Sequence, residues 1–102
     1  MAAKEDKRRS DPVKTVTVRI EGRVQGVFYR AWTEDAARAL GLDGSVRNRP
    51  DGIVEAVFSG PAESVDAMLE RCRQGPPGAR VTEIVVTQVG GTVAPGFRVL
   101  RA

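Results

Sequence analysis

The stretch Lys14–Arg30, KTVTVRIEGRVQGVFYR, decides the fold because its periodicity changes partway along. Its first eight residues, up to Glu21, alternate apolar and polar side chains, and this period of two is typical of a half-buried strand. Gly22 and Gly26 then interrupt the alternation. From about Arg30 onward the apolar residues follow a helical spacing. The stretch therefore predicts a strand, a glycine-bearing loop and the start of a helix.

Two helices are predicted, and each carries one apolar stripe. The first runs from about Arg30 to Leu40 and ends before Gly41, since glycine commonly terminates helices. The second begins near Pro61, which suits the first turn of a helix, and ends at Gly75. The residues at helical spacing are Trp32, Ala36, Ala39 and Leu40 in the first helix, and Val65, Met68, Leu69 and Cys72 in the second.

Further strands are predicted on both sides of the second helix. Ser45–Arg49 and Ile53–Phe58 form a hairpin. In the turn that joins them, a proline presets φ and Gly52 supplies a positive φ. Val81–Val89 alternates like the first strand, and Phe97–Leu100 adds a short edge strand.

The order strand, helix, strand, strand, helix, strand predicts a ferredoxin-like βαββαβ fold, which is an α/β (α+β) sandwich. In this arrangement a mainly antiparallel sheet carries two helices on one face. We assign residues 14–102 to this single domain, and residues 1–13, which are polar and carry both signs of charge, to a disordered tail. The same fold serves binding modules, regulators and enzymes, so function has to be inferred from the site.

The composition excludes most hydrolase mechanisms. Among 102 residues there is no histidine and one cysteine, Cys72, so a histidine general base, a Cys–His pair and a zinc cluster are excluded. Cys72 lies in an apolar stripe and is expected to be a buried structural thiol. Without an intramolecular disulfide or an apolar run of about 20 residues, we expect a cytoplasmic protein that does not span a membrane. The net charge of +3 is too modest to indicate nucleic-acid binding.

The loop before the first helix is a candidate anion site. Glycines allow a tight turn that exposes backbone N–H groups, and the helix that follows directs its positive dipole end at the same space. Arg30 adds a planar guanidinium that can donate two hydrogen bonds to phosphate oxygens. The residues alone are also compatible with a plain strand-to-helix turn and a surface arginine. Asn48, before the hairpin turn, is equally compatible with a side chain that satisfies local backbone groups.

Two motifs resemble those of the acylphosphatase family. Gly22–Arg30 fits the family pattern G-x-V-Q-G-V-x-[FY]-R at every fixed position, and Gly44–Ala56, GSVRNRPDGIVEA, resembles the second family motif. The resemblance covers about residues 15–100. One position departs from the pattern, because Ser45 stands where the family usually has an aromatic residue. We expect altered packing at that position.

The resemblance implies an enzyme that hydrolyses the carboxyl–phosphate bond of acyl phosphates to a carboxylate and inorganic phosphate. It implies that Arg30 holds the phosphate and that Asn48 orients the attacking water. It also implies that no metal or other cofactor is needed, that inorganic phosphate is a competitive inhibitor as well as a product, and that the protein acts as a monomer. The implied phosphate-binding residues are Gln25, Gly26, Val27, Phe28, Tyr29 and Arg30.

Alternatives remain at this level. One is a catalytically weak ferredoxin-like binding or regulatory module, although Ile53–Phe58 offers a single aromatic residue and no basic-aromatic run of the RNA-binding kind. Another is an acylphosphatase-like domain of hydrogenase maturation machinery that acts on carbamoyl phosphate, which usually has further domains downstream. Within the loop, one of Phe28 and Tyr29 is expected to pack inward while the other lines the pocket. The residues do not decide which.

Overall fold

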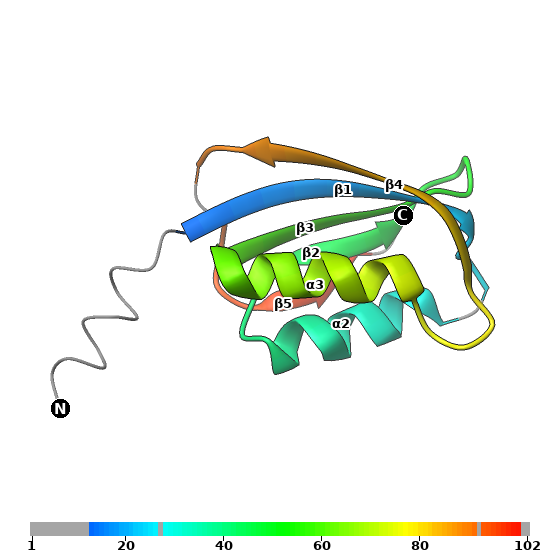
Figure 1. The fold of residues 1–102 in the computed structure, drawn as a ribbon, viewed down its shortest axis with the longest axis horizontal. Coiled ribbons are helices and arrows are strands. Elements are labelled where there is room, and N and C mark those ends of the chain that lie inside the picture. The colour runs from blue at the N-terminus through cyan, green and yellow to red at the C-terminus, as the bar shows by residue number, and fades with distance from the viewer. Residues whose placement is uncertain (1–12, 27, 92, 101–102) are drawn as a thin grey trace, which may run out of the picture.

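The computed structural model describes residues 13–26, 28–91 and 93–100, which form one sheet covered by helices (Figure 1). The predicted tail therefore lies almost entirely outside the described residues. The elements are β1 (Val13–Arg23), α2 (Tyr29–Ala39), β2 (Asp43–Asn48), β3 (Val54–Pro61), α3 (Ala62–Gln74), β4 (Arg80–Val89) and β5 (Phe97–Val99).

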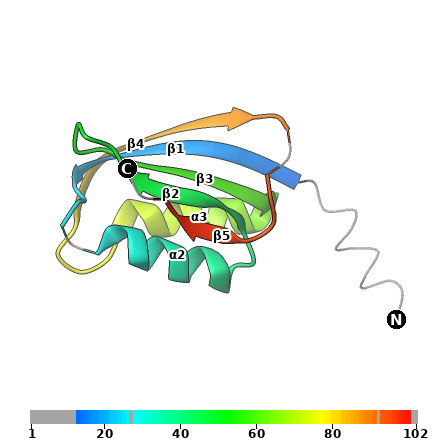
Figure 2. The ribbon, with the colours of Figure 1, turned by 180° about the vertical axis from the view of Figure 1, so that it is seen from behind.

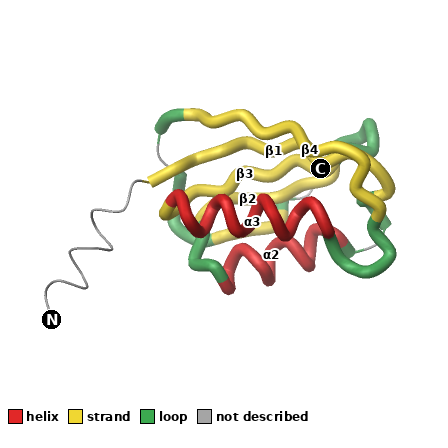
Figure 3. The backbone as a smooth tube through the Cα atoms, in the orientation of Figure 1, coloured by secondary structure: helices red, strands yellow, loops and turns green. Residues whose placement is uncertain are grey.

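The sheet has the strand order β4-β1-β3-β2-β5. The β1, β2, β3 and β4 strands pair antiparallel, whereas β5 runs parallel to β2 at one edge. Both α2 and α3 lie on the same face of this sheet, as Figure 1 and the reverse view in Figure 2 show. Figure 3 shows both helices on one side of the strands, and no helix of the described residues covers the other side. These features confirm the predicted ferredoxin-like sandwich.

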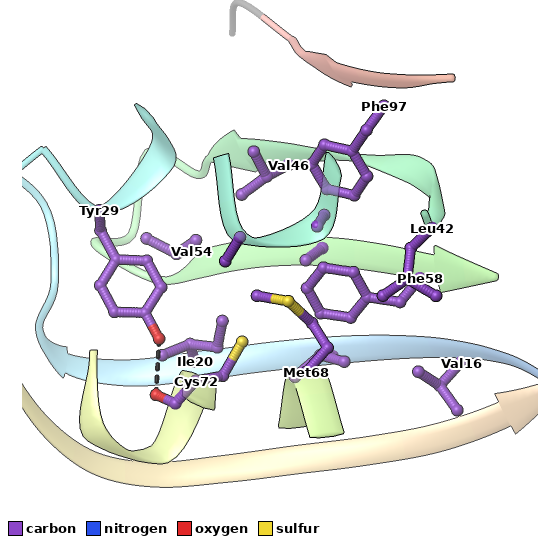
Figure 4. Packing of buried hydrophobic residues seen from close by; sticks show 14 of the residues in the cluster. Val16, Ile20, Tyr29, Leu42, Val46, Val54, Phe58, Met68, Cys72 and Phe97 are labelled. Atoms are coloured by element: carbon purple, nitrogen blue, oxygen red, sulfur yellow. Dashed lines mark hydrogen bonds between the residues drawn. The ribbon is translucent and has the colours of Figure 1, made fainter. Parts of the chain in front are cut away.

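The core fills the space between the sheet and the helices. Alternate residues of β1 and β3 point toward the helices and are fully buried, as the period of two predicts. Figure 4 shows side chains of β1, β3 and α3 converging in this space. The buried residues from these three elements are Val16, Val18, Ile20, Val54, Ala56, Phe58, Val65, Met68 and Cys72.

The buried face of α2 differs from the predicted stripe. The structure buries Tyr29, Thr33, Ala36 and Ala37 and leaves Ala39 exposed, so the assignment of Ala39 to the core was wrong. The phase of the helix is set by Tyr29, the largest fully buried side chain, because positions i, i+4, i+7 and i+8 from it form one face. The loop motif, which was read as separate from the helix, therefore supplies the first core residue of that helix.

Gly22 has a different role from the one predicted for it. The first strand does not end at Glu21 but continues to Arg23, and its pairing with β4 shifts register between Glu21 and Gly22. Gly22 has φ 126°, and a Cβ there would collide with the carbonyl oxygen of Arg80. This glycine is required by a β-bulge that brings two strands close together, and it does not turn the loop.

The remaining element bounds lie within a few residues of the predicted ones. The largest difference is at the end of β3, which continues to Pro61. Pro61 therefore caps α3 from outside instead of occupying its first turn. At the other end, α3 stops at Gly75, which has φ 70° as a glycine terminator allows. Among the described residues, no helix is long and apolar enough to cross a membrane.

Candidate active site

The sheet brings the two predicted catalytic residues to the same end of the molecule. Both β1 and β2 pair antiparallel with β3, so they run in the same direction with β3 between them. Val54 of β3 pairs with Ile20 on one side and with Asn48 on the other. The loop that leaves β1 therefore starts beside the end of β2, and Asn48 comes to face the segment that carries Arg30.

A cavity of about 400 Å³ lies at this junction. It is bounded by the loop, the first turns of α2, the end of β2 and the edge strand β5. The lining residues are Val24, Gln25, Gly26, Phe28, Tyr29, Arg30, Ala31, Glu34, Asn48 and Val99. The structure thus brings together the predicted site residues that it describes, and Val27 lies outside the described residues.

The loop backbone has left-handed conformations on both sides of residue 27. Gly26 has φ 76°, and Phe28 has φ 60° and ψ 28°, an uncommon conformation for a side chain with a Cβ. Phe28 is also the N-cap of α2, and no side chain caps the first N–H groups of that helix. The uncapped N–H groups at the start of α2 are directed away from the helix, where its positive dipole end favours a negatively charged group.

Phe28 and Tyr29 both line the cavity, but they differ in which one packs inward. Tyr29 is 1% exposed and its hydroxyl donates a 2.6 Å hydrogen bond to the carbonyl oxygen of Cys72, shown as a dashed line in Figure 4. The Phe28 ring is 84% exposed at the rim of the cavity. Tyr29 is thus the aromatic residue that packs inward, and it fixes the start of α2 against the end of α3.

Burial makes the two groups at this contact unreactive. It raises the pKa of the Cys72 thiol to about 12 and raises the pKa of Tyr29 well above its usual value. A thiol with so high a pKa is protonated at neutral pH and is a poor nucleophile. The prediction that Cys72 is a buried structural thiol is confirmed.

Asn48 is the last residue of β2 and presents an unsatisfied acceptor. Its Oδ1 atom is buried and has no hydrogen-bond partner among the described residues. Leaving a buried acceptor unpaired costs about 1–3 kcal/mol, so the site is suited to a donor supplied by water or by a ligand. The alternative that the Asn48 side chain satisfies local backbone groups is not supported for this oxygen.

The Gln25 side chain makes two contacts that the sequence did not predict. Its Nε2 atom donates to the carbonyl oxygen of Arg49 at 2.9 Å and to that of Ile53 at 3.2 Å. These carbonyls belong to the turn between β2 and β3. No pattern in the sequence indicates this contact, because it joins segments that only the sheet brings side by side.

Glu34 is a second residue that the sequence analysis missed. It lines the cavity one turn after Arg30. Its carboxylate forms an ion pair of 2.9 Å with Arg38, whose Nη2 also donates to the Phe97 carbonyl oxygen at 3.1 Å. The spacing of four residues from Arg30 was the available signal, because i and i+4 share a helix face.

The described residues include no group of three His, Cys, Asp or Glu side chains that could hold a metal ion. The charged side chains that line the cavity are the Arg30 guanidinium and the Glu34 carboxylate. A single carboxylate is a poor basis for a divalent-cation site, whereas a guanidinium at a helix N-terminus is suited to a phosphate group.

Fold and site together define an α/β sandwich in which a glycine-bearing loop at a helix N-terminus lines a cavity, and Asn48 of a neighbouring strand lines the same cavity. The family model for acylphosphatases matches residues 16–99, so most of the described chain is included. The chain belongs to the acylphosphatase family.

Individual relatives agree with this assignment. The chain is 58% identical to an acylphosphatase of Rhodospirillum rubrum over an alignment of 85 residues. This alignment covers 83% of the chain and 93% of the relative. The structure of an acylphosphatase from Coxiella burnetii superposes with a TM-score of 0.84 at 33% identity, covering 86% of this chain and 93% of that one. For the Bacillus subtilis acylphosphatase the TM-score is 0.82 at 32% identity, with 85% and 98% covered. The expected activity, that of an acylphosphatase, is confirmed, and a purely regulatory module is not supported.

Proposed function

We propose that Arg30 and the loop amides hold the phosphate of an acyl phosphate while Asn48 places the water that attacks it. The observation that supports this assignment is the single cavity lined by both Arg30 and Asn48, in which the Asn48 Oδ1 has no partner among the described residues. The proposed phosphate-binding residues remain Gln25, Gly26, Val27, Phe28, Tyr29 and Arg30. Their backbone N–H groups complete the cradle that the guanidinium closes.

The proposed reaction uses charge stabilisation in place of acid catalysis. As the phosphoryl group is transferred, negative charge spreads over its equatorial oxygens, where Arg30 and the amides hold it. The leaving group is a carboxylate, a weak base with a pKa of about 4 by analogy with side-chain carboxyls. It departs without being protonated, which explains how a chain without histidine performs hydrolysis.

Asn48 contributes orientation. A water that donates to its Oδ1 is held in line with the bond that breaks, and correct placement of a nucleophile is worth several kcal/mol. The proton of the water passes to a phosphate oxygen, so no protein base is needed. No metal is needed either, because the guanidinium and the amides take the place that Mg²⁺ has in other phosphoryl-transfer enzymes.

The other expectations from the sequence belong to the same proposal. The substrate is a small acyl phosphate, and inorganic phosphate competes with it because both require the same cradle. The protein is proposed to act as a monomer. A reducing, cytoplasmic location suits a chain whose one cysteine cannot form an internal disulfide. Residues 14–102 form the catalytic domain and residues 1–13 a tail without a catalytic role.

The test compares two substitutions on benzoyl phosphate and on p-nitrophenyl phosphate, which lacks the easily expelled carboxylate. Arg30→Ala should lower kcat/KM by at least about 10² to 10³, the usual cost of losing one oxyanion donor, and should abolish inhibition by phosphate. Asn48→Ala should lower kcat while the inhibition constant for phosphate stays within about twofold, since Asn48 holds water and not phosphate.

Arg19→Ala is the matched control, because Arg19 is an exposed arginine of β1 that is not among the residues lining the cavity. It should retain normal activity. Near-normal activity of Arg30→Ala would refute the phosphate-binding role, and a parallel loss of phosphate binding in Asn48→Ala would refute the water-placing role. Loss of activity in EDTA that Mg²⁺ restores would refute the metal-free mechanism.

A further inference from the structure

We infer that the Gln25 side chain is a positioning residue for Asn48, which it holds in register with the phosphate loop by bonding to the turn that follows β2. This inference rests on the proposed function of Asn48 and adds a role for an amide side chain that does not itself touch the substrate. Gln25 lies in the loop, and the carbonyls that it bonds belong to Arg49 and Ile53, at the two ends of the turn.

The hydrogen bonds of Gln25 complete a local network. The Arg49 carbonyl oxygen also accepts from the Gly52 N–H at 3.1 Å, and the Ile53 carbonyl oxygen accepts from the Arg49 N–H at 2.8 Å. Gln25 adds one donor to each carbonyl, at 2.9 and 3.2 Å, and so uses both hydrogens of its amide group. The turn is therefore closed by its own backbone and is joined to the loop by Gln25.

Asn48 is coupled to this link through the backbone, because Asn48 ends the strand paired with Val54 and directly precedes the turn that Gln25 bonds. Its Oδ1 has no partner among the described residues, so the position of that oxygen follows the backbone at the end of β2. Arg49 is the next residue and is bonded by Gln25. Within the described ranges, the hydrogen bonds that connect the loop with this turn are those of Gln25.

Loss of the link should impair turnover much more than folding. Each carbonyl keeps its backbone donor when the Gln25 amide is removed, so no buried acceptor is orphaned. Catalysis is more sensitive, because a displacement of about 1 Å between reacting groups can lower a rate by about 10².

The first experiment replaces Gln25 with methionine, which has a similar length and no donor. Gln25→Met should lower kcat for benzoyl phosphate about tenfold and leave the inhibition constant of inorganic phosphate within about twofold. Gln88→Met makes the same change at an exposed position of β4 and should leave both values unchanged. An unchanged kcat in Gln25→Met, or a loss of phosphate binding equal to the loss of kcat, would overturn the inference.

A double-variant cycle separates positioning from a general structural effect. If Gln25 acts through Asn48, Gln25→Met should cost less than about twofold in kcat when it is added to Asn48→Ala. A full tenfold cost in that background would show that Gln25 acts independently of Asn48, and the inference would fail.

Gln25→Glu provides a pH-dependent readout. An ionised carboxylate facing two carbonyl oxygens is repelled, so the protonated form is favoured and its pKa rises above the usual value of about 4.3. The variant should have low activity at pH 7 and regain activity relative to the unsubstituted protein as the pH falls toward about 5, because the protonated carboxyl can donate one hydrogen bond. Equal pH profiles for the two proteins would contradict the inference.

Hydrogen exchange distinguishes failure of this inference from failure of the proposed function. In Gln25→Met the amides of Arg49 and Gly52, which bond the same turn, should exchange about tenfold faster, and this measurement needs no activity. Unchanged exchange together with unchanged kcat overturns the inference and leaves the roles of Arg30 and Asn48 intact. An unsubstituted protein that fails to hydrolyse benzoyl phosphate overturns the proposed function, whereas faster exchange in the variant would still establish the link.

Discussion

Glu34 is the acidic side chain among the described residues that line the cavity. The lining residues Phe28, Ala31 and Val99 are apolar, so under the proposed function Glu34 carries the charge that an acyl group meets there. Arg38 pairs with Glu34 but does not line the cavity, and its side chain is 61% exposed, so it screens that charge only in part. Uncharged acyl groups should therefore be preferred over acyl groups that carry a carboxylate.

Replacement of Glu34 by glutamine should reduce this preference. Succinyl phosphate carries a free carboxylate, which the Glu34 carboxylate repels. Removing this repulsion should raise kcat/KM for succinyl phosphate about two- to fivefold relative to kcat/KM for benzoyl phosphate. This factor corresponds to a repulsion of roughly 0.5–1 kcal/mol between solvent-accessible charges. The ratio should change less in 0.5 M salt than at low salt, since salt screens such charges.

Asp35→Asn is the matched control for this measurement. Asp35 is the next residue of α2, is exposed and does not line the cavity, so the same change in net charge should leave the substrate ratio unaltered. An equal effect of the two substitutions would indicate a general charge effect and would contradict selection by Glu34.

At the scale of single elements, β2 carries the one departure from the family pattern. Ser45 points to the uncovered face of the sheet and pairs with Val57 of β3. A depression of about 280 Å³ lies there, lined by Thr17, Ser45, Arg47, Glu55, Val57 and Leu100. The altered packing that was expected at Ser45 agrees with this depression, because an aromatic side chain at this position would occupy it.

Ser45→Phe should therefore stabilise the fold. Covering apolar surface of Val57 and Leu100 with a ring should add about 1 kcal/mol to the free energy of unfolding, or raise Tm by about 4–8 °C in a domain of this size. Thermal unfolding followed by circular dichroism measures the effect. Ser45→Ala, which brings no ring, should leave Tm nearly unchanged, and an equal Tm for both variants would show that the depression is not filled.

Helices and strands were predictable from the sequence where neighbouring residues alone determine them. The alternation of β1 and the glycine after α3 placed those elements to within two residues, since both depend on the conformation of neighbouring residues. The buried face of α2 was not predictable in this way, because Tyr29 was assigned to the loop motif before the helix. Its inward orientation depends on a hydrogen bond to Cys72, in another helix.

At the scale of the whole molecule, the contact between Tyr29 and Cys72 couples stability to alkaline pH. Both groups are neutral in the folded state, where burial raises the pKa of Cys72 to about 12 and that of Tyr29 well above 10.0. In the unfolded chain they ionise near pH 9.0 and 10.0. The stabilisation is complete below about pH 9 and is lost progressively as the pH rises above it, because the unfolded state then releases more protons.

Unfolding in urea at pH 8, 10 and 11 tests this coupling. The free energy of unfolding should fall above pH 9, with each group contributing up to about 1.4 kcal/mol per pH unit once it is ionised in the unfolded chain. Tyr29→Phe should be less stable at pH 8, because the bond to Cys72 is lost, but should lose less stability between pH 10 and 11. Identical slopes for the two proteins over that interval would contradict the assignment to Tyr29.

The sequence by itself determined the order of the elements, the face that each strand buries, the two motifs and hence the family. These properties follow from local backbone preference and from the spacing of apolar residues, and both depend only on residues close together in the sequence. Only the tertiary structure decided that Asn48 faces the loop of Arg30, that the Gln25 amide links the loop to the turn and that Glu34 lines the cavity. The physical reason is that these contacts join segments distant in sequence, and their geometry depends on the strand order and on the register of β3 with both of its neighbours.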